Sequence, residues 1–313
     1  MDLNRIKPHL PWITLLVLVA IVGIANPAFL HPANLLSLAG DIVPLFIMAL
    51  GMTFAIYIGG IDLSAQSMAN MITVIASLYL AHLGAWVAVV CILAGFLLGG
   101  VSGLVVTRLK VPSFIATLAV GGICFSIAQW LSGNRALNMD AEQRNRIFGW
   151  VIGQTGIVPN ALFVALALLA LCLFIERRTV LGRVLKAVGA GEPAAAAAGI
   201  DVRRYKALAF AISGALAATA GLIFAIKLSG GAPTIANGFL LPAIVAVLVG
   251  GTPLTGGVGG VLNTAIGVMI VAVIRASMLY FGIEATQQQI LFGIVLIGSI
   301  ALTIDRAKLR TVK

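Results

Sequence analysis

Residues 83–107 read LGAWVAVVCILAGFLLGGVSGLVVT, a run of twenty-five residues without a charged side chain. As a helix this run would be about 38 Å long at ~1.5 Å per residue, which exceeds the ~30 Å hydrocarbon core of a bilayer. Backbone groups in lipid must find hydrogen-bond partners within the protein, and a helix supplies them locally. The stretch therefore predicts a membrane-crossing helix.

The rest of the chain has the same character. Of its 313 residues, 61% are hydrophobic and only 10% are charged, whereas soluble domains have ~45–50% apolar and ~25% charged residues. This composition excludes a soluble domain, a disordered chain and a nucleic-acid-binding domain, despite a net charge of +10. Apolar runs occupy residues 10–30, 42–61, 64–82, 83–107, 113–132, 157–175, 207–228, 239–252, 258–280 and 288–304. We expect an all-α membrane protein with about ten transmembrane helices, some broken or re-entrant, the short 239–252 run above all.

The positions of Lys and Arg predict the orientation, because cytoplasmic loops are enriched in these residues. Ten crossings that begin and end in the cytoplasm put 15 of the 20 positive residues inside. The remaining five are Arg135, Arg144, Arg146, Lys227 and Arg275. We therefore expect residues 1–313 to form one transmembrane domain with both termini cytoplasmic. It has an outer loop at about 133–156 and a basic inner loop at about 176–206. Arg275 near a span end is interpreted as a side chain that reaches the interface, or one that touches a solute or a docking partner.

Polar residues inside the apolar runs are the candidates for a solute pathway. Asp62 and Ser64 follow two glycines, where they could cap the next helix or contact a solute. Beyond them, one face of the third predicted span is polar, since its residues recur at helical spacing. This face consists of Gln66, Asn70, Thr73 and Ser77. The face predicts either a pathway lining for a hydroxyl-rich solute or hydrogen bonding between helices.

Two further patterns predict contacts. Gly95, Gly99 and Gly103 form two consecutive G-x-x-x-G steps, which favour close helix packing within the subunit or across a dimer. In the inner loop, residues 192–199 are predicted to form a short helix, with Pro193 in its first turn and Gly199 at its end. A helix this short is unstable alone in water, so we expect a cytoplasmic partner to dock on it. An anionic lipid surface is the other interpretation.

The sequence shows no catalytic constellation, and His9, His31 and His82 are scattered. We expect a non-enzyme without a metal site or a bound cofactor. A membrane-integral enzyme is thereby disfavoured. An ion-coupled secondary transporter stays open, with Asp62 as its best feature, since such carriers hold intramembrane acids.

The chain resembles the permease subunits of bacterial ABC importers of the ribose/xylose/galactose type. The resemblance covers roughly residues 40–305. It rests on GGIDLS (59–64), KVPSFIATL (110–118), AGEPAA (190–195) with AGI (198–200), Lys206 leading into Ser213-Gly214, GGT (250–252) and GG (256–257). In that family, residues 192–199 correspond to the coupling helix that contacts the ATPase. Here this segment is unusually rich in alanine, and Arg275 stands where similar permeases often have an uncharged polar residue. The coupling residues implied are Glu192, Pro193, Ala194, Ala195, Ala198 and Gly199.

The resemblance also implies the partners and the mechanism. A second permease, identical or related, completes the membrane core, two cytoplasmic ATPase subunits carry ATP and Mg²⁺, and a periplasmic binding protein delivers the solute. The expected location is the bacterial inner membrane. The implied function is import of a small hydrophilic solute, most simply a monosaccharide, by alternating access. A permease for branched-chain amino acids is the related alternative.

Overall fold

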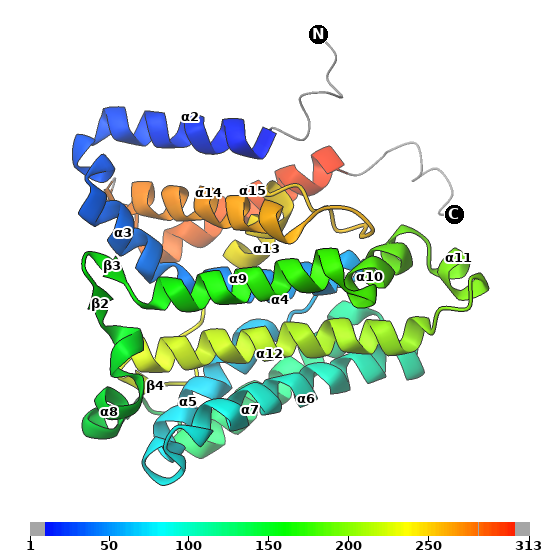
Figure 1. Ribbon diagram of the computed structural model, residues 1–313, viewed down its shortest axis with the longest axis horizontal. Coiled ribbons are helices and arrows are strands. Elements are labelled where there is room, and N and C mark those ends of the chain that lie inside the picture. The colour runs from blue at the N-terminus through cyan, green and yellow to red at the C-terminus, as the bar shows by residue number, and fades with distance from the viewer. Residues whose placement is uncertain (1–9, 281, 304–313) are drawn as a thin grey trace.

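A computed structural model describes residues 10–280 and 282–303, and the helices lie roughly along one axis (Figure 1). The helices, in chain order, are α2 (Leu10–Ala25), the 3-10 turn η2 (Pro27–Leu30), α3 (Pro32–Asp41), α4 (Val43–Tyr57), α5 (Ala65–Leu83), α6 (Trp86–Arg108), α7 (Ser113–Ser132), α8 (Ala141–Ile152), α9 (Ala161–Arg178), α10 (Val180–Ala190), α11 (Glu192–Ala197), α12 (Val202–Leu228), α13 (Leu240–Val249), α14 (Val261–Tyr280) and α15 (Ala285–Thr303). The all-α fold class is confirmed.

Two pairs of very short strands lie among the connections. Strand β1 (Leu137–Asn138) pairs antiparallel with β4 (Gly230–Gly231), and β2 (Gln154–Thr155) pairs antiparallel with β3 (Val158–Pro159). Together with α8 they lie at the left of Figure 1, whereas α10 and α11 lie at the right. We call these the α8 end and the α11 end of the molecule.

Each of the ten predicted apolar runs contains a helix. Four of the helices, α6, α7, α12 and α14, are individually long and apolar enough to cross a membrane. Helices α3 and α4 pass the same test together, as a pair bent by 51°. The other helices are shorter, less apolar or more charged. The structure thus supports a multi-pass membrane protein with one bent helix pair, while the number ten stays a prediction. The termini lie outside the described residues.

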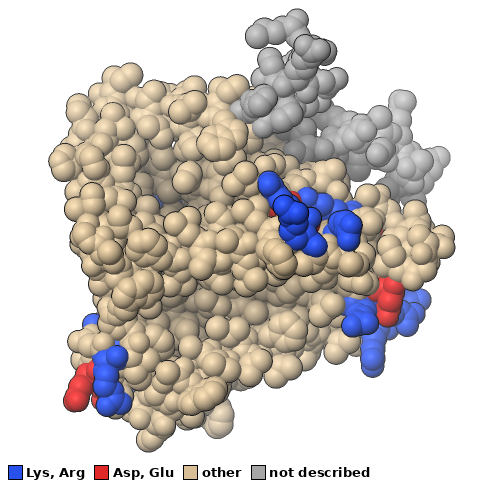
Figure 2. All heavy atoms as spheres, viewed as in Figure 1, with Lys and Arg blue, Asp and Glu red and all other residues tan. Residues whose placement is uncertain are grey.

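Charged side chains gather at the two ends. On the face shown in Figure 2, blue and red atoms occupy the α11 end and the α8 end, and the belt between them is free of charge. Large apolar side chains of the long helices are exposed, for example Leu97 of α6 at 64% and Leu166 of α9 at 57%. Such exposure is expected where lipid rather than water surrounds a protein.

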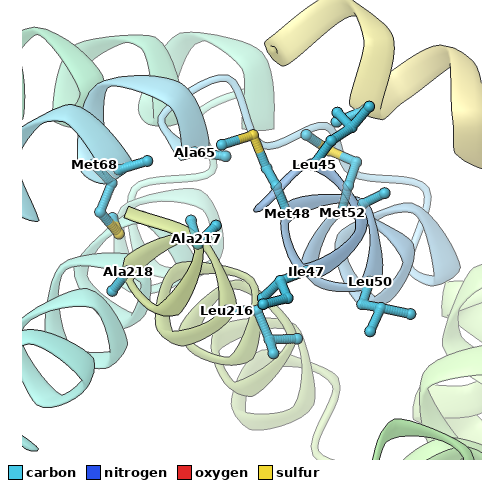
Figure 3. Close-up of a cluster of buried hydrophobic side chains, with 14 of the residues drawn as sticks. Leu45, Ile47, Met48, Leu50, Met52, Ala65, Met68, Leu216, Ala217 and Ala218 are labelled. Atoms are coloured by element: carbon cyan, nitrogen blue, oxygen red, sulfur yellow. The ribbon is translucent and has the colours of Figure 1, made fainter. Parts of the chain in front are cut away.

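Helix α12 is the centre of the bundle and is almost entirely buried. Its residues Leu216, Ala217 and Ala218 meet the apolar side chains of α4 and α5 (Figure 3). Dispersion and burial in this cluster hold the three helices together. This arrangement matters for function because the helical structure is interrupted next to these helices. Residues 58–64 separate α4 from α5, and residues 229–239 follow α12.

Helix α6 lies directly against α12, and glycines make the approach possible. A methyl group on Gly95 would overlap the carbonyl of Gly214, and one on Gly99 would overlap the carbonyl of Phe210. At the next step, a methyl group on Gly103 would lie 2.5 Å from the α-carbon of Ala207. The structure therefore places the three predicted packing glycines at a contact within the subunit.

Three helices in the predicted loops were missed by the sequence reasoning. These are α3, α8 and α10. Helices α3 and α8 carry polar faces, and α10 is short and amphipathic, so neither hydropathy nor length marked them as helices. Helix α8 begins at Asp140, whose side chain accepts a hydrogen bond from the Gln143 amide at 2.8 Å. Asp is a preferred N-cap residue, so Asp140 is a local sequence signal that could have predicted a helix start there.

Candidate functional site

The segment of residues 229–249 is only half helical. Residues 229–239 are non-helical, and α13 then continues for ten residues, or about 15 Å at ~1.5 Å per residue. The predicted break near 239–252 is therefore real, but most of the non-helical chain precedes α13 instead of interrupting it. A break of this kind leaves backbone N–H and C=O groups that lipid cannot satisfy.

The polar face of α5 supplies the missing partners. The Ala232 amide donates to Thr73 Oγ1 at 3.2 Å, the Ala236 amide to Asn70 Oδ1 at 2.6 Å, and the Gly238 amide to Gln66 Oε1 at 3.1 Å. The fourth residue of this face, Ser77, donates instead to the carbonyl of Thr73 in its own helix. Three of the four predicted polar residues thus accept hydrogen bonds from the backbone of the non-helical segment 229–239.

Asn237 is a site residue that the sequence reasoning missed. Its side chain is exposed, and its Oδ1 accepts hydrogen bonds from Asn70 Nδ2 at 2.9 Å and from Gln66 Nε2 at 3.3 Å. A carboxamide fixed in this way can still bond a hydroxyl group through its own NH₂. In the sequence, Asn237 lies between two apolar runs and looks like an ordinary loop residue. Only the contact with α5 reveals its position.

A second break, at residues 58–64, separates α4 from α5. The carboxylate of Asp62 is completely buried, and it accepts hydrogen bonds from the Ser64 amide at 3.0 Å, from Ser64 Oγ and from Ser213 Oγ at 2.6 Å. Ser64 itself makes no side-chain capping bond to α5. Asp62 therefore links the break to α12 through Ser213. In this conformation the Asp62 carboxylate is not accessible to a solute.

Helix α7 satisfies two further amides of this break. Ser113 Oγ accepts from the Ile61 amide at 3.2 Å, and Thr117 Oγ1 accepts from the Leu63 amide at 3.0 Å. Further along α7, a methyl group on Gly121 would lie 3.2 Å from the α-carbon of Ser64. Gly121 is eight residues beyond the start of α7, so the break reaches about 12 Å into the bundle. Two residues after this break, Gln66 contacts the non-helical segment 229–239, which enters the bundle from the α8 end.

A third non-helical segment, residues 250–260, meets the first part of the 58–64 break at the α11 end. The Gly257 amide donates to the carbonyl of Tyr57 at 2.9 Å. Gly257 has φ +78°, which only glycine adopts at little cost. Helix α10 covers this contact, since a methyl group on Gly189 would overlap the Tyr57 carbonyl and the Gly257 amide. Helix α10 thus touches two breaks at once.

An ion pair joins the same segments and was not predicted from the sequence. Lys186 of α10 lies 2.6 Å from Glu176 of α9, whose side chain is only 7% exposed, and Lys186 also donates to the Gly259 carbonyl at 2.9 Å. The other Glu176 oxygen accepts from the Val261 amide at 2.9 Å, at the start of α14. Both residues looked like part of a basic loop, because a charge in the sequence does not reveal its partner.

We predict that Glu176→Gln destabilises this junction by about 2 kcal/mol, because it leaves Lys186 without its buried counter-ion. The loss falls below that of a fully buried pair, since Lys186 is 30% exposed. Thermal unfolding of the purified protein measures it. Asp41→Asn is the control, because it breaks an exposed pair with Lys227 and should cost less than about 1 kcal/mol. Equal losses for the two variants would contradict the assignment.

Helix α11 protrudes from the α11 end. It spans Glu192–Ala197 and is therefore shorter than the predicted 192–199 segment, with Ala198 and Gly199 forming the turn that follows. Glu192 pairs with Lys206 of α12. Ala195 is buried, whereas the remaining predicted coupling residues are exposed. These are Glu192, Pro193, Ala194, Ala198 and Gly199. Ala195 thus packs α11 onto its own subunit, and the exposed residues form a surface.

A cavity of about 500 Å³ separates the base of α11 from the 58–64 break. Gly59, Gly60 and Ser113 line one side, and Glu192 and Lys206 line the other. The cavity gives the break room to move relative to α11 and opens at the α11 end. The breaks at residues 229–239 and 58–64 thus enter the bundle from opposite ends and approach each other near Gln66. Helix α10 contacts the chain at the start of the 58–64 break and in residues 250–260, and α11 follows α10 in the chain.

A protein-family model described as "Branched-chain amino acid transport system / permease component" matches residues 34–300. The chain belongs to this family of transport permeases. The match includes both breaks, the polar face of α5 and α11. Transporters commonly form their solute sites from discontinuous helices inside the membrane, which is the arrangement seen here.

Named relatives agree with this family. The chain is 34% identical to the ribose import permease of Haemophilus influenzae over 92% of this chain and 90% of the relative. It is 34% identical to the ribose import permease of Bacillus subtilis over 95% and 92%, respectively. Identity to the xylose transport system permease of Escherichia coli is 29% over 90% of this chain and 87% of the relative. No solved structure matches the chain.

Proposed function

We propose that this chain is the membrane permease of an ABC importer that carries a monosaccharide into the cell. The relatives named above import ribose or transport xylose, and they align over nearly the whole chain. They favour a sugar over a branched-chain amino acid, although the family description mentions the latter. They likewise favour an ABC importer over an ion-coupled carrier. Asp62, the best feature of the ion-coupled alternative, is occupied by hydroxyl and amide donors.

The proposed topology has ten crossings, both termini in the cytoplasm and the α11 end facing the cytoplasm. The described Lys and Arg residues support this orientation, since nine lie in the segments of the α11 end and five in those of the α8 end. The latter five are the residues predicted to face outward, Arg275 included. We place the protein in the bacterial inner membrane, where the positive-inside rule applies.

The contacts of α10 and α11 carry the proposed mechanism. A separate ATPase subunit docks on the exposed residues of α11 and hydrolyses ATP with Mg²⁺, so this chain binds no cofactor and no metal and is not an enzyme. Movement of α11 passes to α10, and α10 touches both the Tyr57–Gly257 contact and the Glu176–Lys186 pair. Docking of the ATPase can therefore shift the breaks at 58–64 and 250–260 together.

The pathway follows from the same geometry. A periplasmic binding protein delivers the sugar to the α8 end, and a second permease, identical or related, completes the membrane core. The sugar then passes the polar residues near the broken crossing, with Asn237 as its contact and with Gln66, Asn70 and Thr73 as the groups that position the segment. Asp62 and Ser64 hold the inner break closed until α10 moves. Because the binding protein selects the sugar, the pathway needs only weak polar contacts.

Uptake by reconstituted protein tests this function. The permease is reconstituted into liposomes together with the ATPase, and the binding protein is added to the opposite side. Uptake of radiolabelled ribose, xylose and leucine is then measured separately. We expect ATP-dependent uptake of a pentose. Uptake of leucine would instead support the amino-acid permease, and uptake driven by an ion gradient without ATP would support a secondary transporter.

A bulky residue on the exposed face of α11 is expected to block docking. Ala194→Trp should reduce ATP-driven uptake at least about tenfold, because it places a large side chain in the contact with the ATPase. Thermal unfolding of the permease alone should not change, since Ala194 is exposed. Ala170→Trp is the matched control, an exposed alanine on α9. Unchanged uptake by Ala194→Trp would rule out α11 as the docking helix.

A further inference from the structure

Arg275 of α14 is a cation that the proposed transport mechanism does not use. Its guanidinium carbon lies 4.5 Å from the centroid of the Phe239 ring. Within residues 10–280 and 282–303, no carboxylate or hydrogen-bond acceptor contacts the guanidinium. A cation in a membrane protein is costly without an anionic or polar partner, so its partner is expected to come from outside the described residues.

Arg275 lines a cavity of about 390 Å³ at the α8 end. Three aromatic residues, Phe29, Phe239 and Tyr280, form part of its wall. Asp41 also lies on the wall, but Lys227 neutralises it at 2.9 Å. The three charged groups near the opening therefore leave one positive charge. Aromatic rings and a guanidinium are typical of the level at which lipid headgroups meet the hydrocarbon.

A second cavity, of about 400 Å³, continues from the first toward the middle of the bundle. The two share Phe29, Leu38 and Ile42. Every residue that lines the second cavity is apolar, and these residues come from α2, η2, the α3–α4 segment, α9 and α14. Along α14 the groove extends from Ala265 to Val273, about 12 Å. One leaflet contributes half of the ~30 Å hydrocarbon core, so the groove matches the depth of a single leaflet.

We propose that the two cavities form one binding site for a phospholipid from the leaflet at the α8 end. The phosphate pairs with the guanidinium of Arg275, which can donate two parallel hydrogen bonds to its oxygens. An acyl chain fills the apolar groove between α2 and α9. A sugar has no apolar group for the second cavity, and an apolar helix of a second permease has no anionic group for Arg275. A phospholipid has a group for each cavity, a phosphate for Arg275 in the first and an acyl chain for the apolar second one.

Native mass spectrometry of the full-length protein tests the site. The protein is purified in a mild detergent, delipidated and titrated with phosphatidylglycerol. We expect the wild type to bind one lipid at low concentration. Arg275→Gln should lower the bound fraction at least about tenfold, as the loss of a charge-assisted contact predicts. Arg144→Gln, the same change on the exposed helix α8, should leave it unchanged.

The groove is tested by filling it. Leu166→Trp places a larger side chain in the lining, and Leu171→Trp is the control on the same helix, exposed but outside the groove. We expect only Leu166→Trp to reduce lipid binding. Equal binding by wild type and Arg275→Gln would overturn the proposal. So would a lipid-free dimer that Leu166→Trp dissociates, since the groove would then be an interface between two copies of the chain.

Discussion

Gly99→Leu is expected to keep α6 from its place against α12 and to cost about 3 kcal/mol or more of folding free energy. Overpacking a core by a few methylene groups costs ~1–3 kcal/mol when side chains can move aside. Here the new side chain would meet the backbone carbonyl of Phe210, which cannot move without α12. Because α12 is the centre of the bundle, we expect a large fall in the yield of folded protein and in its thermal unfolding temperature.

The neighbouring residue provides the control. A methyl group on Gly100 would find only the Ala211 side chain, at 3.8 Å. Gly100→Leu should therefore leave both measurements close to those of the wild type, although it changes helix composition and apolar area by the same amount. If the two variants behave alike, the α6–α12 contact does not depend on the glycine at position 99.

Asn70→Leu is expected to destabilise the protein by about 3 kcal/mol and to abolish uptake. The substitution removes the acceptor of the Ala236 amide and the donor to Asn237. Each buried group left without a partner costs ~1–3 kcal/mol, and more where water is excluded. Thermal unfolding of the purified variant measures the first effect, and reconstituted uptake measures the second. Gln129→Leu is the control, since it removes an exposed carboxamide contact with Asn134.

Asn237→Ala separates the two roles of the polar cluster. Asn237 bonds to side chains of α5 and is exposed, so its removal leaves no buried backbone group unpaired. Asn237→Ala does leave the side-chain amide of Asn70 without its acceptor, so we expect it to raise the KM for uptake and to cost about 1 kcal/mol, less than Asn70→Leu. The opposite outcome, loss of stability with an unchanged KM, would make the cluster a structural element alone.

Hydropathy predicts where the helices lie, and each of the ten apolar runs contains a helix, because length and apolarity are properties of each segment alone. The glycines at positions 95, 99 and 103 were predicted as packing residues for the same reason, since a helix places them on one face. Their partner, α12, could not be predicted, because the periodicity of one helix does not identify its neighbour. The same limit applies to Asp62, whose partner Ser213 lies 151 residues further along the chain.

The polar face of α5 shows where sequence reasoning about the site reaches its limit. Helical spacing correctly brought Gln66, Asn70 and Thr73 together. The spacing left open whether these side chains meet a solute or the protein. In the structure all three accept hydrogen bonds from backbone amides of residues 232–238. Asn237, Glu176 and Lys186 were missed altogether. Each owes its position to a segment that is distant in sequence, and local composition carries no signal of it.

The half-length of α13 has an electrical consequence. The amides of Gly238 and Leu240, at its N-terminal end, both point to Gln66 Oε1, at 3.1 and 3.4 Å. A helix start carries roughly half a positive charge, and its partner here is a neutral carboxamide. The helix start therefore contributes a local positive potential beside Gln66, which disfavours protons and metal cations but not uncharged sugars. On the proposed pathway this local potential opposes the leak of a cation, and each leaked charge would dissipate ~2.3 kcal/mol per 100 mV of membrane potential.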